Sequence, residues 1–145
     1  MPRPLRNVLA VLAGIVIGGG VNMALIMLSP SLIPPPPGVD VTNAESLGRS
    51  IHLFEPRHFV MPFLAHALGS FVGAIAAYLL AASHQARLAY GVGAFFLLGG
   101  ISASFMIPAP AWFIALDLTA AYLPMAWLGI QVGRRVRRGN AAGDR

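Results

Sequence analysis

Asp117 is a carboxylate inside a long apolar run, and it is the strongest chemical constraint in this 145-residue chain. The run from 111 to 133 is long enough to cross the hydrocarbon core of a bilayer, where an isolated charge costs at least a few kcal/mol. The other long apolar runs contain no carboxylate. A carboxylate in such a place is paired, hydrated or protonated, and these states correspond to an ion pair, an ion-binding site or a proton-exchanging group.

Two further polar residues, His66 and Asn22, are placed to join Asp117. Each of the three belongs to a stripe of small residues at helical spacing, so all three are expected to face the interior of a helix bundle. Counted from the predicted helix ends, they share a depth of about 10 Å below one membrane surface. Ser102 and Ser104 lie at a similar or slightly shallower depth and are candidate hydroxyl partners. The stripes are Ala10-Gly14-Gly18-Asn22, His66-Gly69-Gly73 and Asp117-Ala120-Ala121-Pro124.

Three interpretations of this polar layer differ in their chemistry. In the first, His66 and Asp117 form a buried structural pair, completed by Asn22 and a serine. In the second, the pair binds and releases a proton or cation, as in a small transporter or channel. In the third, the pair holds a metal ion with a residue of an external lid, as in an intramembrane metalloenzyme, although no tight ligand spacing such as HExxH is present. The lid candidates are His52, Glu55 and His58.

Methionines on the same side of the predicted bundle raise Cu(I) as a further metal alternative, because thioethers and imidazoles together bind this ion. Methionine is also an ordinary apolar filler, and the sequence identifies no cofactor. A non-enzymatic role is favoured. The methionines concerned are Met23, Met27, Met61 and Met106.

Composition predicts an all-α integral membrane protein. Hydrophobic residues make up 57% of the chain, charged residues 10%, and the mean hydropathy is +0.71; an ordinary soluble domain has about 25% charged residues. The absence of cysteine excludes disulfides and thiolate metal sites. We expect one domain, 1–145, with the lipid bilayer as its principal partner.

Four membrane spans are predicted, at 7–29, 59–82, 88–107 and 111–133. The first is too long for the core of a signal peptide. Small-residue stripes predict close packing among the spans, with a homo-oligomer as the alternative use of the same stripes. Pro124 is expected to kink the fourth span. Aromatic residues are interpreted as interfacial anchors, namely Tyr90, Trp112, Tyr122 and Trp127.

The arginines predict that both termini are cytoplasmic. Arg49 and Arg57 lie on one predicted side, and all other arginines, including the basic tail at 134–145, lie on the opposite side. The tail is interpreted as a topology anchor, with binding of anionic lipid as the alternative. It is too short to indicate nucleic-acid binding.

The connection at 30–58 is predicted to be an ordered external lid. Its prolines, 34–37, favour polyproline II, and Thr42 to Glu45 match a helix capping box. A short interfacial helix follows, with a Glu45–Arg49 side-chain pair, and Pro56 ends it. The apolar face of this helix carries Leu47, Ile51 and Phe54.

Three segments resemble those of a family of small four-span bacterial inner-membrane proteins that has no assigned activity. The segments are FEPRHF at 54–59, FLAHALG at 63–69 and YLPMAW at 122–127, and the similarity covers most of the chain. The resemblance implies the four-span topology and a bacterial inner-membrane location. It implies no reaction.

Overall fold

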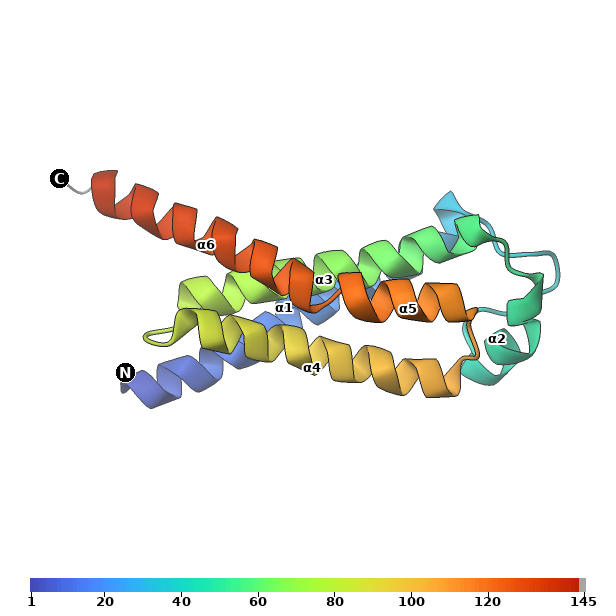
Figure 1. Ribbon diagram of the computed structural model, residues 1–145, viewed down its shortest axis with the longest axis horizontal. Helices are drawn as coiled ribbons and strands as arrows, with labels where there is room; N and C mark the ends of the chain where they lie inside the picture. Colours follow the sequence, from blue (N-terminus) through green and yellow to red (C-terminus); the bar gives the residue numbers. More distant parts are fainter. Residues whose placement is uncertain (144–145) are drawn as a thin grey trace.

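The computed structural model describes residues 1–143, and 82% of the chain is helical. Four helices are long and apolar enough to span a membrane, which is the number of apolar helices predicted (Figure 1). They are α1 (Arg3–Leu32), α3 (Val60–Leu80), α4 (Gln85–Met106) and a fourth made of α5 (Ala111–Ala120) and α6 (Leu123–Gly143). The predicted spans agree with these helices, although α1 starts earlier and α6 continues through the basic tail. Arg145, which was used in assigning the sides, lies outside the described residues.

The fourth helix is interrupted at Ala121 and Tyr122, so the predicted kink is confirmed. Proline has no N–H, and Pro124 therefore cannot donate to the carbonyl of Ala120, where the α-helical bond would form. The interruption turns α6 away from α5 (Figure 1). It also changes the direction of the chain four residues after Asp117, which shapes the polar site described below.

Glycine allows α1 and α3 to pack with their backbones in contact. A Cβ added at Gly18 would lie 2.5 Å from the carbonyl oxygen of Gly69, and one added at Gly73 would lie 2.7 Å from that of Gly14. The same device brings α6 onto α3, where a Cβ at Gly129 would lie 2.7 Å from the carbonyl oxygen of Phe71. The small-residue stripes are therefore intramolecular contact surfaces.

The half of the bundle nearer the termini is filled by small apolar side chains. A fully buried cluster joins α3, α4 and α6 there, with Val11 and Ile15 of α1 packed against it. We call this part of the bundle the closed half. Its cluster consists of Ala74, Ala77, Ala89, Val92, Ala126 and Ile130.

Polar groups of α1 and α6 hold the C-terminal end of α3. Arg6 Nε donates to the carbonyl of Leu80 at 2.8 Å, and Arg137 donates to that of Ala81 at 3.4 Å. Asn7 Oδ1 accepts from the backbone N–H groups of Ala82 and Ser83 at 2.9 and 3.2 Å. Donors at a helix C-terminus satisfy carbonyls that lack partners within the helix. Sequence patterns do not predict this arrangement, because the arginines also fit a role in membrane topology.

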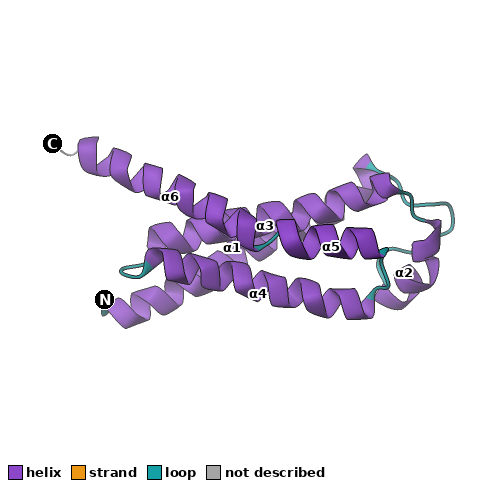
Figure 2. Ribbon diagram, in the orientation of Figure 1, coloured by secondary structure: helices purple, strands orange, loops and turns teal. Residues whose placement is uncertain are grey.

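The segment between α1 and α3 is ordered at the end of the bundle opposite the two termini (Figures 1 and 2). It contains α2 (Ala44–Ser50) and two short 3₁₀ helices, η1 (Ile51–Leu53) and η2 (Pro56–Phe59). The predicted helix and its Glu45–Arg49 pair are confirmed.

The start of α2 differs from the predicted capping box by one residue. Asn43 is the N-cap, and its side chain accepts from the N–H groups of Glu45 and Ser46. Thr42 instead donates to Asp40 from its backbone and its hydroxyl, at 2.8 and 2.6 Å. These hydrogen bonds hold the pKa of Asp40 below its usual value because they favour the ionised carboxylate.

We expect Gly18→Ala to destabilise the bundle, because the added methyl group meets the backbone of α3. Overpacking of this kind costs about 1–3 kcal/mol. The measurement is the fraction of protein that stays monodisperse in detergent after heating through a temperature series.

Gly19→Ala is the matched control, since a Cβ there meets nothing within 4 Å. It should be neutral or stabilising, because alanine favours a helix by about 1 kcal/mol over glycine. Equal thermal profiles for the two variants would contradict backbone contact between α1 and α3.

Candidate functional site

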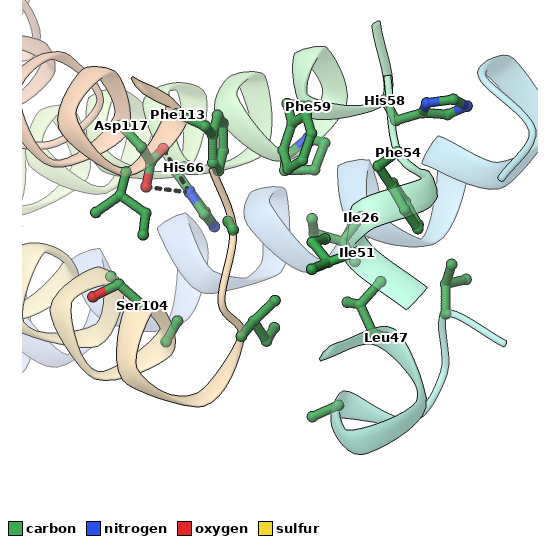
Figure 3. A pocket seen from close by; sticks show the side chains of 18 of the residues that line it. Ile26, Leu47, Ile51, Phe54, His58, Phe59, His66, Ser104, Phe113 and Asp117 are labelled. Carbon is green, nitrogen blue, oxygen red and sulfur yellow. Dashed lines mark hydrogen bonds and ion pairs between the residues drawn. The ribbon is translucent and has the colours of Figure 1, made fainter. Parts of the chain in front are cut away.

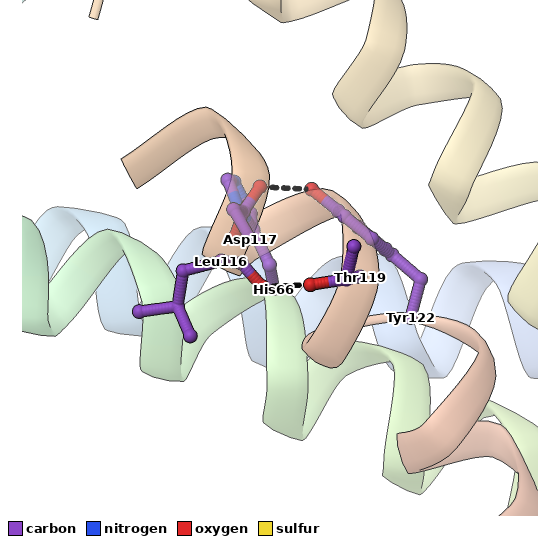
Figure 4. A network of polar contacts seen from close by, with 5 residues as sticks. All are labelled: His66, Leu116, Asp117, Thr119 and Tyr122. Carbon is purple, nitrogen blue, oxygen red and sulfur yellow. Dashed lines mark hydrogen bonds and ion pairs between the residues drawn. The ribbon is translucent and has the colours of Figure 1, made fainter. Parts of the chain in front are cut away.

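His66 of α3 and Asp117 of α5 form a hydrogen-bonded pair inside the bundle (Figures 3 and 4). His66 Nδ1 lies 2.8 Å from Oδ1 and 3.0 Å from Oδ2 of Asp117. The Asp117 side chain is 7% exposed and that of His66 is 24% exposed. The carboxylate is thus almost fully enclosed, while the imidazole keeps one open side.

Tyr122 is the second partner of Asp117. Its hydroxyl donates to Oδ2 at 2.8 Å, and its ring stacks on His66 with a centroid distance of 5.6 Å and an interplanar angle of 26°. The residue is only 2% exposed, so its predicted role as an interfacial anchor was wrong. The other three predicted anchors, Tyr90, Trp112 and Trp127, are exposed.

Regular helical periodicity does not predict the contact between Tyr122 and Asp117. In an unbroken helix, side chains five residues apart point about 140° away from each other. The interruption before Pro124 removes that separation and lets Tyr122 fold back onto Asp117. Gly100 of α4 leaves room for the phenol, since a Cβ there would overlap its hydroxyl and ring. Gly100 and Pro124 are thus the sequence signals that could have located Tyr122.

A cavity of about 380 Å³ lies against the open side of the pair (Figure 3). The segment between α1 and α3 contributes Leu47, Ile51 and Phe54 to its wall, and His66 and Asp117 lie at its inner end. Most of the remaining lining is apolar. The cavity therefore combines a hydrocarbon-like interior with one strongly polar spot.

The predicted polar layer is only partly assembled. Ser104 lines the cavity, but its hydroxyl donates to the carbonyl of Ile101 at 2.7 Å. Ser102 is exposed and donates to the carbonyl of Leu98 at 2.9 Å, so it does not reach the cavity. Asn22 is half-buried and packs against Gly69 in the α1–α3 contact. Within residues 1–143, the structure shows no hydrogen bond from Asn22 to His66 or Asp117.

One of the three lid candidates belongs to the cavity. His58 is buried and lines it, and its Nδ1 accepts from the backbone N–H of Glu55 at 2.9 Å. The Glu55 side chain instead pairs with Arg57 at 2.9 Å on the surface, and His52 is also exposed.

The predicted metal sites are not assembled in the described part of the chain. Residues 1–143 contain no group of three His, Cys, Asp or Glu side chains that could share a metal ion. Met61 is buried, whereas Met23, Met27 and Met106 are exposed on the outside of the bundle. The side chains considered as metal ligands therefore do not form a metal site within these residues.

The geometry defines what His66 offers to a molecule in the cavity. An ionised carboxylate only accepts hydrogen bonds, so the imidazole donates to Asp117 from Nδ1. In the neutral ring, Nε2 is then an acceptor. This second nitrogen points away from Asp117, on the cavity side (Figure 3). His66 can therefore form a hydrogen bond with a molecule in the cavity through Nε2, as the acceptor in the neutral ring or as the donor in the imidazolium.

Comparison with known proteins finds no family model, no curated protein and no solved structure that matches this chain. The resemblance to four-span bacterial proteins therefore stays a prediction. The function of the protein is therefore inferred from the geometry of the site itself.

We expect Tyr122→Phe to destabilise the protein by about 1–2 kcal/mol, because Asp117 loses a buried donor while the aromatic ring stays in place. The measurement is the midpoint of thermal unfolding in detergent. Tyr90→Phe, which removes an exposed hydroxyl from α4, is the control and should leave the midpoint unchanged. A Tyr122→Phe midpoint equal to that of the wild type would show that this hydrogen bond contributes nothing to stability.

Proposed function

We propose that the chain is a multi-pass protein of the bacterial inner membrane that binds a small amphipathic molecule in the outer half of its bundle. No chemical reaction is assigned to it. The apolar surface of the helices supports the membrane location, and the cavity supports the binding role.

Surface composition supports the membrane location. Large apolar side chains cover the outside of the helices, and only 11% of the most apolar window of α1 is buried within the protein. A bilayer is the environment that suits such a surface. The two termini share one end of the bundle, together with seven arginines of the described chain (Figure 1). The opposite end carries two arginines and three carboxylates, which supports cytoplasmic termini.

The cavity at His66 and Asp117 is the observation that carries the binding role. Binding sites for small molecules are commonly clefts of about 300–1,000 Å³ with apolar walls and a few placed polar groups, and this cavity fits that description. A purely structural pair does not require a cavity of this size beside it, because Asp117 obtains its hydrogen bonds within the bundle. Here the imidazole keeps an open side.

Packing below the pair favours binding over passage across the membrane. Tyr122 and Ala121 are fully enclosed next to Asp117, and beyond them the closed half is filled by its alanine-rich cluster. A solute that enters the cavity therefore meets a wall of packed side chains at Tyr122.

Proton- or cation-coupled transport is the second candidate function. It is favoured by the titratable groups His66, Asp117 and Tyr122, which are linked by hydrogen bonds at the inner end of the cavity. Ser70 adds a fully buried hydroxyl without a partner among the described residues, one helical turn beyond His66. Such groups are typical of proton pathways in membranes.

Filling the cavity should abolish ligand binding. Ala103 lines the cavity, and we expect Ala103→Leu to lower the affinity of the protein in lipid nanodiscs for alkyl alcohols by tenfold or more, about 1.4 kcal/mol. Binding is measured by the amount of radiolabelled alcohol retained. Ala94→Leu, on the exposed side of the same helix, is the control and should bind as the wild type does. Undiminished binding in Ala103→Leu would refute the cavity as the site.

Flux measurements separate the two candidate functions. Under the binding role, proteoliposomes containing the wild-type protein should pass protons, Na⁺ and K⁺ no faster than protein-free liposomes, at every pH tested. A flux that is present in the wild type and lost in a folded Asp117→Asn variant would replace the binding role with transport.

A further inference from the structure

A second cavity, of about 500 Å³, adjoins the first beneath the segment between α1 and α3. The two share lining residues from three parts of the chain, among them Ile26 of α1, Leu47 of α2 and Phe54. The two spaces therefore lie side by side, and a molecule longer than either one can extend from one to the other where these side chains move aside. The head of such a molecule would lie at His66 and its remainder in the second cavity.

The second cavity reaches the outer end of α1, on the surface that faces lipid. Met23 and Met27 contribute to its lining, and they are 57% and 74% exposed on the outside of the bundle. The same helix end contains Pro30, which cannot donate to the carbonyl of Ile26. The wall between this cavity and the bilayer is thus made of flexible thioether side chains and a helix end that lacks one backbone hydrogen bond.

We infer that the ligand is an uncharged single-chain amphiphile with a hydroxyl head, and that it enters sideways from the outer leaflet past Met23 and Met27. The hydroxyl forms a hydrogen bond with His66 Nε2, and the alkyl chain lies in the second cavity. This inference rests on the proposed binding function and adds to it the class of ligand and the route of entry.

The choice of head group follows from charge and desolvation. Nε2 accepts a hydrogen bond in the neutral imidazole and donates one in the imidazolium, and a hydroxyl head can pair with either form. A carboxylate head would bring a second negative charge towards Asp117, and an ammonium head would lose its hydration among apolar walls. A hydroxyl satisfies Nε2 at a much smaller desolvation cost, because only one polar group leaves water.

The second cavity suits an alkyl chain because its lining is chiefly aliphatic and proline side chains. Ile33, Pro35 and Pro62 line it together with the methionines. A chain that leaves the hydrocarbon of the bilayer for this space exchanges one apolar environment for another, so its position is decided by packing and by the hydrogen bond at His66. The head group thus determines whether the molecule stays.

The experiment uses proteoliposomes and a long-chain alcohol with a photoreactive diazirine near the middle of its alkyl chain. After irradiation, mass spectrometry locates the labelled residues. We expect labelling between residues 23 and 35 that excess unlabelled alcohol removes. Ala103→Leu should reduce this displaceable labelling about tenfold because the head no longer reaches His66, whereas Ala94→Leu should not.

Head-group selectivity is measured by competition with a chain-matched amine and a chain-matched carboxylic acid. We expect the alcohol to displace the probe at a concentration about tenfold lower than either. Stronger displacement by the amine or the acid would overturn the assignment of a hydroxyl head.

Three outcomes distinguish the inference from the proposed function. Labelling at 23–35 that neither excess alcohol nor Ala103→Leu changes reports ordinary lipid contact and overturns the inference. Displaceable labelling confined to α4 or to residues 44–59 overturns the tail position and the route, while leaving the binding function intact. Alcohol binding that is insensitive to Ala103→Leu by every measure removes the proposed function as well.

Discussion

A carboxylate enclosed by apolar helices must have its charge satisfied by donors held in place, and this requirement accounts for much of the structure around Asp117. The donors come from two directions: His66 across the α3–α5 contact, and Tyr122 from the interruption that follows α5. Removing either would leave an underpartnered charge in a medium of low polarity. Three features together place these donors around Asp117: the interruption before Pro124, the missing side chain at Gly100 and the orientation of His66.

The two halves of the bundle use opposite packing strategies. Near the termini, glycines and alanines bring the helices together until little space remains. Towards the segment between α1 and α3, two adjoining cavities remain between the helices. Side chains of α2 and η1 contribute to their walls. The polar pair lies where these regions meet. It is shielded from one side by packed side chains and remains accessible from the other.

Sequence reasoning predicted the features that depend on regular periodicity. Four apolar runs gave four helices, and the helical spacing of small residues correctly turned His66 and Asp117 towards each other. The predicted side-chain directions were wrong where the backbone departs from a regular helix, between α5 and α6. Tyr122 was assigned to the membrane interface because an unbroken helix would carry it away from Asp117.

Local competition for hydrogen bonds explains the remaining differences. Asn43, rather than Thr42, caps α2 because the threonine is engaged by Asp40. Ser102 and Ser104 lie near the expected depth but return their hydroxyls to carbonyls of their own helix, which spacing alone does not reveal. Asn22 faces inward as expected, but at the α1–α3 contact. The depth of a residue in the bundle and the direction of its side chain can thus be predicted from sequence. Its hydrogen-bond partner depends on the neighbouring backbone.

The position of Tyr122 in the same span as Asp117 has a consequence for how the chain assembles. His66 lies in the second span and is synthesised well before the fourth, so the carboxylate is the last member of the pair to arrive. A tyrosine five residues away travels with it and can shield the acid locally before the helices dock. Docking of the helices then adds the contact with His66, and the folded protein keeps both.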